Sequence, residues 1–213
     1  MYCVVQARCG SKRLNRKIFK KIKNKSIIER VISRLEKSKK ISKIIIATSI
    51  DKKDNDIEKF CKKKKISYYR GSLNNVALRF LQISKKYNLK SLIRISCDSP
   101  FINYKILDEG ISFFKKNEFD IITNVFPRTY PKGLSYEIFK TSILKNNIKF
   151  FSNKDKEHVT TFFYKNFKNY KIYNFYSLKR FKNINLCVDT KKDLVFLRKN
   201  YNKILKLNFY EKN

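Results

Sequence analysis

The sequence has few of the residues on which metal centres, disulfide-bonded folds and glycine-rich nucleotide motifs depend. Its 213 residues include one histidine, no tryptophan, three prolines and four glycines. Neither GxxxxGK[ST] nor GxGxxG occurs, which excludes a P-loop and a dinucleotide-binding fingerprint. The five cysteines are scattered, odd in number and never spaced as CxxC. This usage argues against a zinc site and favours a reducing compartment, the cytoplasm.

Long apolar runs are absent as well. No stretch approaches 18 uninterrupted apolar residues, and the N-terminus has neither a cationic leader nor a small-residue cleavage site. We therefore expect neither membrane association nor export. Hydrophobic residues still make up 42% of the chain and aromatic residues 15%, which is enough for a packed core. The composition predicts a globular protein.

Acidic residues are scarce, with 17 Asp and Glu against 51 Lys and Arg, so the formal net charge is +34. Such a charge is typical of proteins that bind nucleic acid. However, 40 of the cations are lysines spread over every segment, and Lys, Asn, Ile, Phe and Tyr are abundant together, as A/T-rich codons would produce. We favour codon bias and expect no specific nucleic-acid partner. Weak, nonspecific binding of polyanions at low salt follows under either interpretation.

Short apolar strands alternate with amphipathic helices along the first 125 residues. Strands are expected at 2–6, 43–49, 66–69, 92–96 and 120–125, and helices at 26–35, 54–64, 74–87 and 104–116. Residues 43–49, KIIIATS, are apolar enough for a strand buried on both faces. This order predicts a three-layer α/β fold with a mostly parallel sheet.

Beyond residue 126 the alternation loosens. We expect a loop at 127–135 (PRTYPKGLS), a strand and a helix within 136–151, a helix near 157–167, strands at 170–176 and 186–188, and a closing helix from Lys191. No linker or internal repeat interrupts the chain. The sequence therefore predicts one domain that spans residues 1–213.

Ligands of open parallel sheets bind at the carboxyl ends of the strands, so the segments that follow strands are candidate sites. The first strand runs into QARCGSKRL, residues 6–14, where Gly10 lets the main chain approach a ligand and Ser11 adds a hydroxyl. The neighbouring cations repel one another unless an anion such as a triphosphate lies among them. A solvated basic loop is the simpler alternative.

Two aspartates follow later strands in similar settings. Asp98 lies in SCDSP (96–100) and Asp189 in VDT (188–190). Either residue alone could be a turn or helix cap. Side by side next to a phosphate-binding loop, they would hold Mg²⁺, which prefers oxygen ligands and usually takes one or two carboxylates plus substrate phosphates.

These segments resemble the sugar-activating cytidylyltransferases, whose signature is (P/Q)AR-x-GS-x-RL. The similarity is closest to the subgroup of the spore coat polysaccharide biosynthesis protein F, and the acylneuraminate and 3-deoxy-manno-octulosonate cytidylyltransferases are related. Further blocks follow in the family's order along nearly the whole chain: IATS (46–49), RGS (70–72) with Arg79, RISCDSP (94–100), PRTYP (127–131), EHVT (157–160) and VDT (188–190).

The resemblance implies a Rossmann-like, GT-A-like fold of the nucleotide-diphospho-sugar transferase type. It also implies a Mg²⁺-dependent reaction in which the anomeric hydroxyl of an acidic sugar attacks the α-phosphate of CTP, giving a CMP-sugar and pyrophosphate for polysaccharide or glycan biosynthesis. Residues 1–125 would form the nucleotide-binding half, and residues 126–213 the acceptor-sugar half with the closing helix. A homodimer would fit the family.

The resemblance also assigns roles to individual residues. The nucleotide would be bound by Gln6, Ala7, Arg8, Gly10, Ser11, Arg13, Lys17, Arg70, Gly71, Ser72 and Arg79. The catalytic residues would be Arg8, Arg13, Lys17 and Asp98, and the Mg²⁺ ligands Asp98 and Asp189. The acceptor sugar would be bound by Arg128, Tyr130, Glu137, Glu157 and His158. The chain departs from the family's pattern at Asn15 and Arg16, where relatives have Pro-Gly, and at Lys132 and Ser135, where relatives often have acidic residues.

Two alternatives stay open at this point. One is a basic α/β protein that binds nucleic acid or keeps the fold without catalysis, and the other is nucleotidyl transfer from a different NTP. Asp98 and Asp189 favour the metal-dependent transferase, because carboxylates in a basic cleft repel phosphate unless a metal intervenes.

Overall fold

The sheet at the centre of the molecule confirms the α/β class. The structure is a computed structural model that describes residues 1–179, 181 and 184–210. Seven strands pair in the order β5-β4-β1-β6-β8-β7-β9, and β8 is antiparallel to both neighbours while the other pairs are parallel. The strands are β1 (Tyr2–Gln6), β4 (Lys43–Ser49), β5 (Ser67–Gly71), β6 (Ser91–Ser96), β7 (Ile121–Thr123), β8 (Glu137–Lys140) and β9 (Ile172–Asn174).

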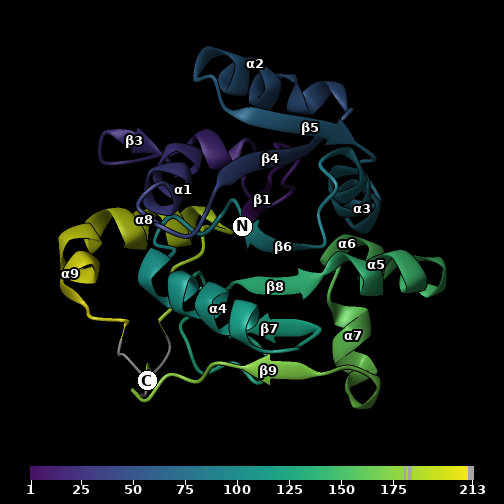
Figure 1. Cartoon of the computed structure of the whole chain (residues 1–213). Helices are drawn as coiled ribbons and strands as arrows, with labels where there is room; N and C mark the ends of the chain where they lie inside the picture. Colours follow the sequence, from purple (N-terminus) through teal and green to yellow (C-terminus); the bar gives the residue numbers. More distant parts are fainter. Residues whose placement is uncertain (180, 182–183, 211–213) are drawn as a thin grey trace.

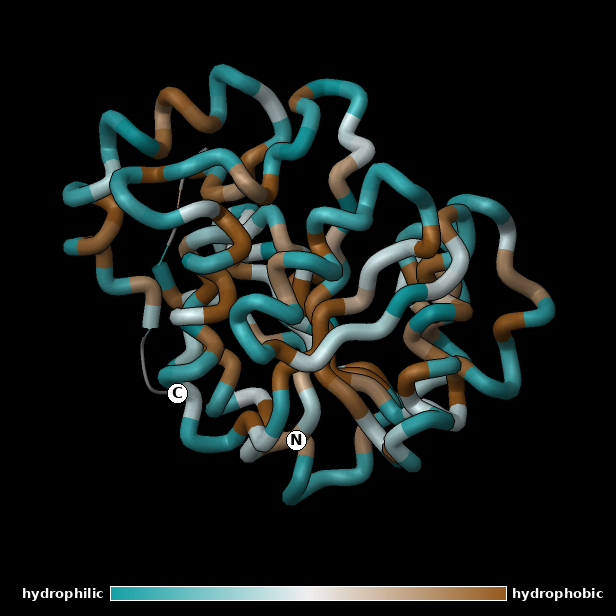
Figure 2. The backbone as a smooth tube through the Cα atoms, turned by 90° about the horizontal axis from the view of Figure 1, so that it is seen from above, coloured by the Kyte–Doolittle hydropathy of each residue, from teal (hydrophilic) through white to brown (hydrophobic). Residues whose placement is uncertain are grey.

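Helices cover both faces of this sheet, because the strands are apolar on both (Figures 1 and 2). One face carries α1 (Ile27–Leu35), α2 (Asn55–Lys63), α4 (Tyr104–Lys116), α8 (Lys191–Lys199) and α9 (Tyr201–Lys206). The other carries α3 (Val76–Lys86), α5 (Thr141–Asn147), α6 (Asn153–His158) and α7 (Thr161–Lys165). Figure 2 shows the hydrophobic segments concentrated in the centre, with hydrophilic segments around the outside.

The remaining elements are short. In the part of the chain that the structure describes, four 3-10 helices lie at η1 (Lys17–Phe19), η2 (Lys52–Asp54), η3 (Ile148–Phe150) and η4 (Phe167–Asn169). A small hairpin, β2 (Lys21–Ile22) with β3 (Lys25–Ser26), leads into α1 and was not expected from the sequence. It lies against α8, where Arg198 Nε donates to the carbonyl of Lys21 at 2.8 Å, so the closing helices pack beside the N-terminal segment (Figure 1).

Two expected elements in the second half are wrong. Residues 186–188 are not a strand of the sheet; they lie along two other segments, with Leu186 N donating to Lys132 O and Val188 N to Asp98 O. The helix expected at 157–167 is divided, because Val159 has φ 62 and Thr160 N donates to His158 O at 2.7 Å in a tight γ-turn. The closing helix begins at Lys191 as expected, and a second short helix, α9, follows it after Asn200.

The path of the chain through the sheet locates the candidate site. From β1 the chain moves outward on one side to β4 and β5, and then crosses to β6 on the other side of β1. This reversal between β1 and β6 is a topological switch point, where open α/β sheets bind ligands beyond the carboxyl ends of the strands. The basic loop follows β1, and Asp98 follows β6. No helix of the described residues is long and apolar enough to cross a membrane.

Candidate nucleotide and metal site

The loop after β1 is anchored at its base by a buried carboxylate. Asp54 accepts hydrogen bonds from Cys9 N at 2.6 Å and from Ser49 Oγ at 2.5 Å, which ties the loop to the end of β4. The carbonyl of Cys9 accepts from the amides of Ser11 and Arg16, which closes the loop on itself. Sequence reasoning missed Asp54, because it stands among the charged residues at the start of a surface helix.

The loop keeps the shape that a glycine would favour. Arg16 occupies the family's glycine position and adopts the left-handed region, with φ 51 and ψ 34. This conformation is unfavourable for a non-glycine residue by about 1–2 kcal/mol. An ion pair of 2.7 Å between Arg16 and Asp56 accompanies it.

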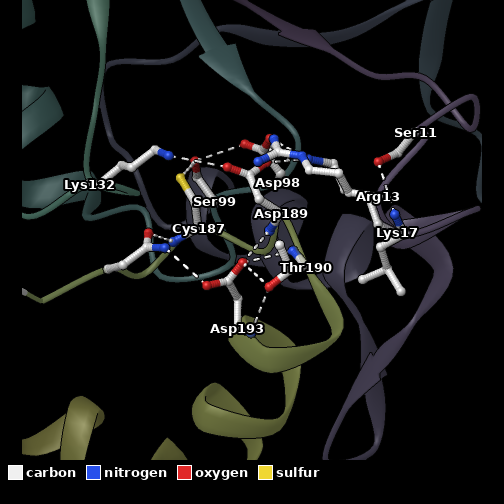
Figure 3. Close-up of polar contacts among 12 residues, drawn as sticks. Ser11, Arg13, Lys17, Asp98, Ser99, Lys132, Cys187, Asp189, Thr190 and Asp193 are labelled. Atoms are coloured by element: carbon white, nitrogen blue, oxygen red, sulfur yellow. Dashed lines mark hydrogen bonds and ion pairs between the residues drawn. The ribbon is translucent and has the colours of Figure 1, made fainter.

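Asp98 and Asp189 meet in front of this loop. Lys17 Nζ lies 2.7 Å from Asp98 Oδ2 and 3.0 Å from Asp189 Oδ1, so one ammonium group joins both carboxylates (Figure 3). A main-chain hydrogen bond of 2.9 Å from Val188 N to Asp98 O holds the two segments together. The pair expected from the sequence is therefore brought together at the switch point.

Asp189 reaches the site because its neighbours cap helix α8 in its place. Thr190 is the N-cap residue and forms a capping box with Asp193. Asp193 Oδ2 also accepts a hydrogen bond of 3.1 Å from Asp189 N. Asp98 is likewise not needed as a helix cap, because Asn103 caps α4. Neither aspartate is the helix cap that each could have been by sequence alone.

Three cations surround Asp189. Besides Lys17, Arg13 Nη2 lies 3.3 Å from Oδ1 and Lys132 Nζ lies 3.1 Å from Oδ2. Burial by itself would raise the pKa of the Asp189 carboxyl, but Lys17 and Lys132 outweigh it and lower the pKa to about 2. Burial would lower the pKa of Lys17, whereas Asp98 and Asp189 outweigh burial and raise it. Asp189 and Lys17 are therefore both charged at neutral pH.

Lys132 was not among the residues expected at the site. It lies in the loop 127–135, which packs closely on the segment before Asp189. Gly133 makes this contact possible: its φ is +101, and a Cβ there would lie 2.6 Å from the main-chain carbon of Leu186. In the sequence, Lys132 stands out only because relatives often have an acidic residue at this position. Its contact with Asp189 is known only from the fold.

Arg8, another cation of the basic loop, has a carboxylate partner too. Arg8 Nη2 lies 2.8 Å from Glu157 Oε1 at the end of α6, so this ion pair joins the two halves of the chain. The neighbours Gln6 and Ala7 are held within the protein: Gln6 Oε1 accepts from Arg94 Nε at 2.9 Å, and Ala7 N donates to Ala47 O. The cations of this loop tolerate one another because acidic side chains already lie among them.

A cleft of about 480 Å³ opens at the carboxyl end of β5, where the family's base segment was expected. Arg70, Gly71 and Ser72 line it together with the start of α3. The guanidinium of Arg70 is engaged by Glu58 and by the carbonyls of Ser49 and Asp51.

Arg79 lies beneath this cleft and is 2% exposed. It donates to Ala47 O at 3.0 Å, and burial lowers its pKa to about 10. Gly71 is required by packing, since a Cβ there would lie 2.8 Å from Arg79 Cγ. Arg79 therefore packs behind Gly71 and does not itself line the cleft.

The five residues expected on the acceptor side are divided between surface and core. Arg128, Glu157 and His158 have exposed or partly exposed side chains, and Arg128 Nη1 donates to Ser135 Oγ at 2.8 Å. Tyr130 and Glu137 are buried. Glu137 accepts from Arg94, Thr160 and Tyr164, the last at 2.7 Å. This network braces β6, β8 and α7, and the roles of these five residues in binding sugar stay predictions.

The donor set at Asp98 and Asp189 fits Mg²⁺. Both ligands are carboxylates, they converge on one point, and an ammonium cation lies between them. Within the described residues no third His, Cys, Asp or Glu joins the pair. Mg²⁺ is commonly bound by one or two carboxylates that act together with substrate phosphates, so two are sufficient.

Comparison with known proteins adds independent observations. A family model described as cytidylyltransferase matches residues 2–213. An uncharacterised protein of Methanocaldococcus jannaschii is 37% identical over 194 residues, which cover 89% of this chain and 78% of that protein. The spore coat polysaccharide biosynthesis protein SpsF of Bacillus subtilis is 26% identical over 210 residues, 94% of this chain and 85% of that protein. The structure of a cytidylyltransferase from Leptospira borgpetersenii superimposes with a TM-score of 0.86 at 27% identity, and 99% of each chain is covered.

These similarities extend over the sheet, both helix layers and the segments that carry Asp98 and Asp189. The resemblance found in QARCGSKRL and the later sequence blocks is confirmed by the family match. The chain belongs to the cytidylyltransferase family and is a nucleotidyltransferase enzyme.

Proposed function

We propose that this protein transfers a cytidylyl group from CTP to an acidic sugar and releases pyrophosphate. The observation that carries the proposal is the meeting of Asp98 and Asp189, from distant parts of the chain, with Arg13 and Lys17 at the carboxyl ends of β1 and β6. The name of the Bacillus subtilis relative supports a role in polysaccharide biosynthesis. By family resemblance alone, the enzyme would act in the cytoplasm as a homodimer.

The chemistry is an in-line displacement at the α-phosphorus, so the protein's task is to align the reactants and neutralise charge on phosphate oxygens. Arg13 and Lys17 would bind those oxygens, and Gly10, which has open space beside it, would let the main chain approach them. Mg²⁺, when bound by Asp98 and Asp189, would neutralise charge that develops on the phosphates.

The two halves of the chain would then have separate tasks. Residues 1–125 contain the cleft lined by Arg70, Gly71 and Ser72, which would take the cytosine base. Residues 126–213 contain Arg128 and the α6 end with Glu157, which would face the acceptor. An arginine suits the carboxylate of an acidic sugar, because its planar guanidinium binds such a group with two hydrogen bonds.

Binding and turnover test this proposal. We expect CTP to bind in the presence of Mg²⁺ and pyrophosphate to be released when a suitable acidic sugar is supplied. Asp98→Asn should abolish both, because the metal loses one of its two ligands. The matched control is Asp120→Asn, which removes a carboxylate paired with Lys140 at the opposite end of the sheet. Equal CTP affinity with and without Mg²⁺, measured by calorimetry, would reject the mechanism.

The same assay separates the alternatives. A panel of the four NTPs with several acidic sugars, followed by pyrophosphate release, identifies both donor and acceptor. Preference for another NTP would keep the fold and the carboxylate mechanism but replace CTP. No release from any pair, together with tight binding of duplex nucleic acid, would favour a relative that has lost catalysis.

A further inference from the structure

Lys17 has an unusual position for a phosphate-binding lysine. Its ammonium group donates to Asp98 at 2.7 Å and to Asp189 at 3.0 Å, and its side chain is 12% exposed. It thus occupies the space between the two carboxylates, where a divalent cation shared by them would have to lie (Figure 3). An ammonium and a divalent metal are both hard cations that prefer oxygen partners. They therefore compete for the same two side chains.

The charges around Asp98 and Asp189 favour Lys17 over a divalent cation that arrives without a nucleotide. Arg13 and Lys132 also contact Asp189, so three cations surround two carboxylates and the cluster carries a net charge of +1. A divalent ion arriving alone would add two more positive charges and would have to displace Lys17 into a loop already rich in cations. A triphosphate brings several negative charges and offers oxygen atoms that Lys17 can bind in place of the carboxylates.

We propose that Lys17 is an exchangeable internal counter-ion of Asp98 and Asp189, which makes metal binding depend on the arrival of the nucleotide's triphosphate. This inference rests on the proposed function, since it concerns the same site. Lys17 moves from carboxylate to phosphate when the nucleotide enters, and the two aspartates then become metal ligands. The metal and the nucleotide bind together, and the metal alone binds poorly.

Binding of Mn²⁺ without nucleotide tests the competition, because free Mn²⁺ has a paramagnetic resonance signal that disappears on binding. We expect Lys17→Met to bind Mn²⁺ at least about tenfold more tightly than the wild type. Lys12→Met, which removes one charge from an exposed position in the same loop, is the matched control and should stay within about twofold of the wild type. Equal Mn²⁺ affinity of Lys17→Met and Lys12→Met would overturn the proposal.

Two further measurements guard against an unstable variant. Lys17→Gln keeps a polar side chain and should give the same gain in Mn²⁺ affinity, which adding Asp98→Asn should remove. In the wild type, Mg²⁺ alone should leave the thermal unfolding midpoint unchanged, whereas Mg²⁺ with CTP should raise it. A midpoint raised as far by Mg²⁺ alone as by Mg²⁺ with CTP would contradict the exchange.

The outcome is distinguishable from a failure of the proposed function. A wild type that releases pyrophosphate from CTP yet binds Mn²⁺ tightly by itself would overturn the exchange and leave the transferase activity intact. If the wild type releases no pyrophosphate, but Lys17→Met binds Mn²⁺ more tightly than the wild type, the proposed activity would be overturned and the exchange supported.

Discussion

Gly10 is the residue of the basic loop that the protein's own packing does not require. A Cβ added there would meet no heavy atom within 4 Å, and its φ is not positive. Gly133 differs on both counts, because it has φ +101 and would bring a Cβ to 2.6 Å from Leu186. A glycine that neither packing nor conformation demands, at the mouth of the candidate site, fits the close approach of a ligand.

Gly10→Ala separates these roles. We expect the free energy of unfolding to stay the same or rise by up to about 1 kcal/mol, because alanine has fewer unfolded conformations than glycine. CTP affinity should fall at least about tenfold, because the added methyl group would occupy the space that a bound phosphate needs. Urea unfolding and calorimetry measure the two effects. Gly133→Ala, as a contrast, should lower stability, and undiminished CTP affinity in Gly10→Ala would contradict the role given to Gly10.

At the scale of elements, the start of α8 does two things at once. Its capping box satisfies the helix amides through Thr190 and Asp193, and Asp193 also receives the amide of Asp189. A hydrogen bond of 3.2 Å from Asn185 Nδ2 to Asp193 Oδ1 fixes the preceding segment. The helix cap thereby holds the main chain of Asp189 in the position from which its carboxylate meets Lys17.

Asp193→Ala tests this coupling between cap and site. The loss of a capping residue should lower the free energy of unfolding by about 1 kcal/mol. CTP affinity in the presence of Mg²⁺ should fall as well, because Asp189 loses its support. Lys192→Ala, at the exposed neighbouring position of the same helix, should change neither quantity. A variant that is destabilised but binds CTP normally would show that Asp193 acts only as a cap.

At the scale of the whole molecule, the net charge of +34 has to be reconciled with a site that contains carboxylates. Most lysines are spread over the surface, whereas Asp98 and Asp189 lie where cations converge: Asp189 contacts Arg13, Lys17 and Lys132. The overall charge attracts any polyanion, whereas under the proposed function the arrangement around Asp98 and Asp189 would favour an anion that brings a metal.

The salt concentration and one substitution should distinguish nonspecific DNA binding from the binding of CTP with Mg²⁺. Affinity for a short DNA duplex should be independent of its sequence and should fall by about three orders of magnitude between roughly 50 and 200 mM salt. Asp98→Asn should leave DNA affinity unchanged or slightly higher, since it removes a negative charge, while it abolishes binding of CTP with Mg²⁺. Fluorescence anisotropy with labelled DNA measures the first effect. Sequence-specific DNA binding at high salt would revive the nucleic-acid hypothesis.

The sequence by itself determined the α/β class, the order of the five strands and four helices expected over the first 125 residues, and the family. Buried strands and amphipathic helices have distinct periodicities, and motifs such as QARCGSKRL are local. It also identified Asp98 and Asp189 as a candidate pair, because both follow apolar segments predicted to be strands. In the second half the elements are short and irregular, so local pattern failed at residues 157–167 and 186–188, where turns and packing against other segments decide the conformation.

Only the tertiary structure decided which charges are neighbours. Lys17 lies between the two aspartates, Lys132 contacts Asp189 from the loop 127–135, Arg8 pairs with Glu157, and Arg79 and Glu137 are buried. These contacts join residues far apart in the chain, and they depend on the strand order of the sheet and on the close packing at Gly133. Sequence gives the identity of each charge, but its partner is set by distance in space.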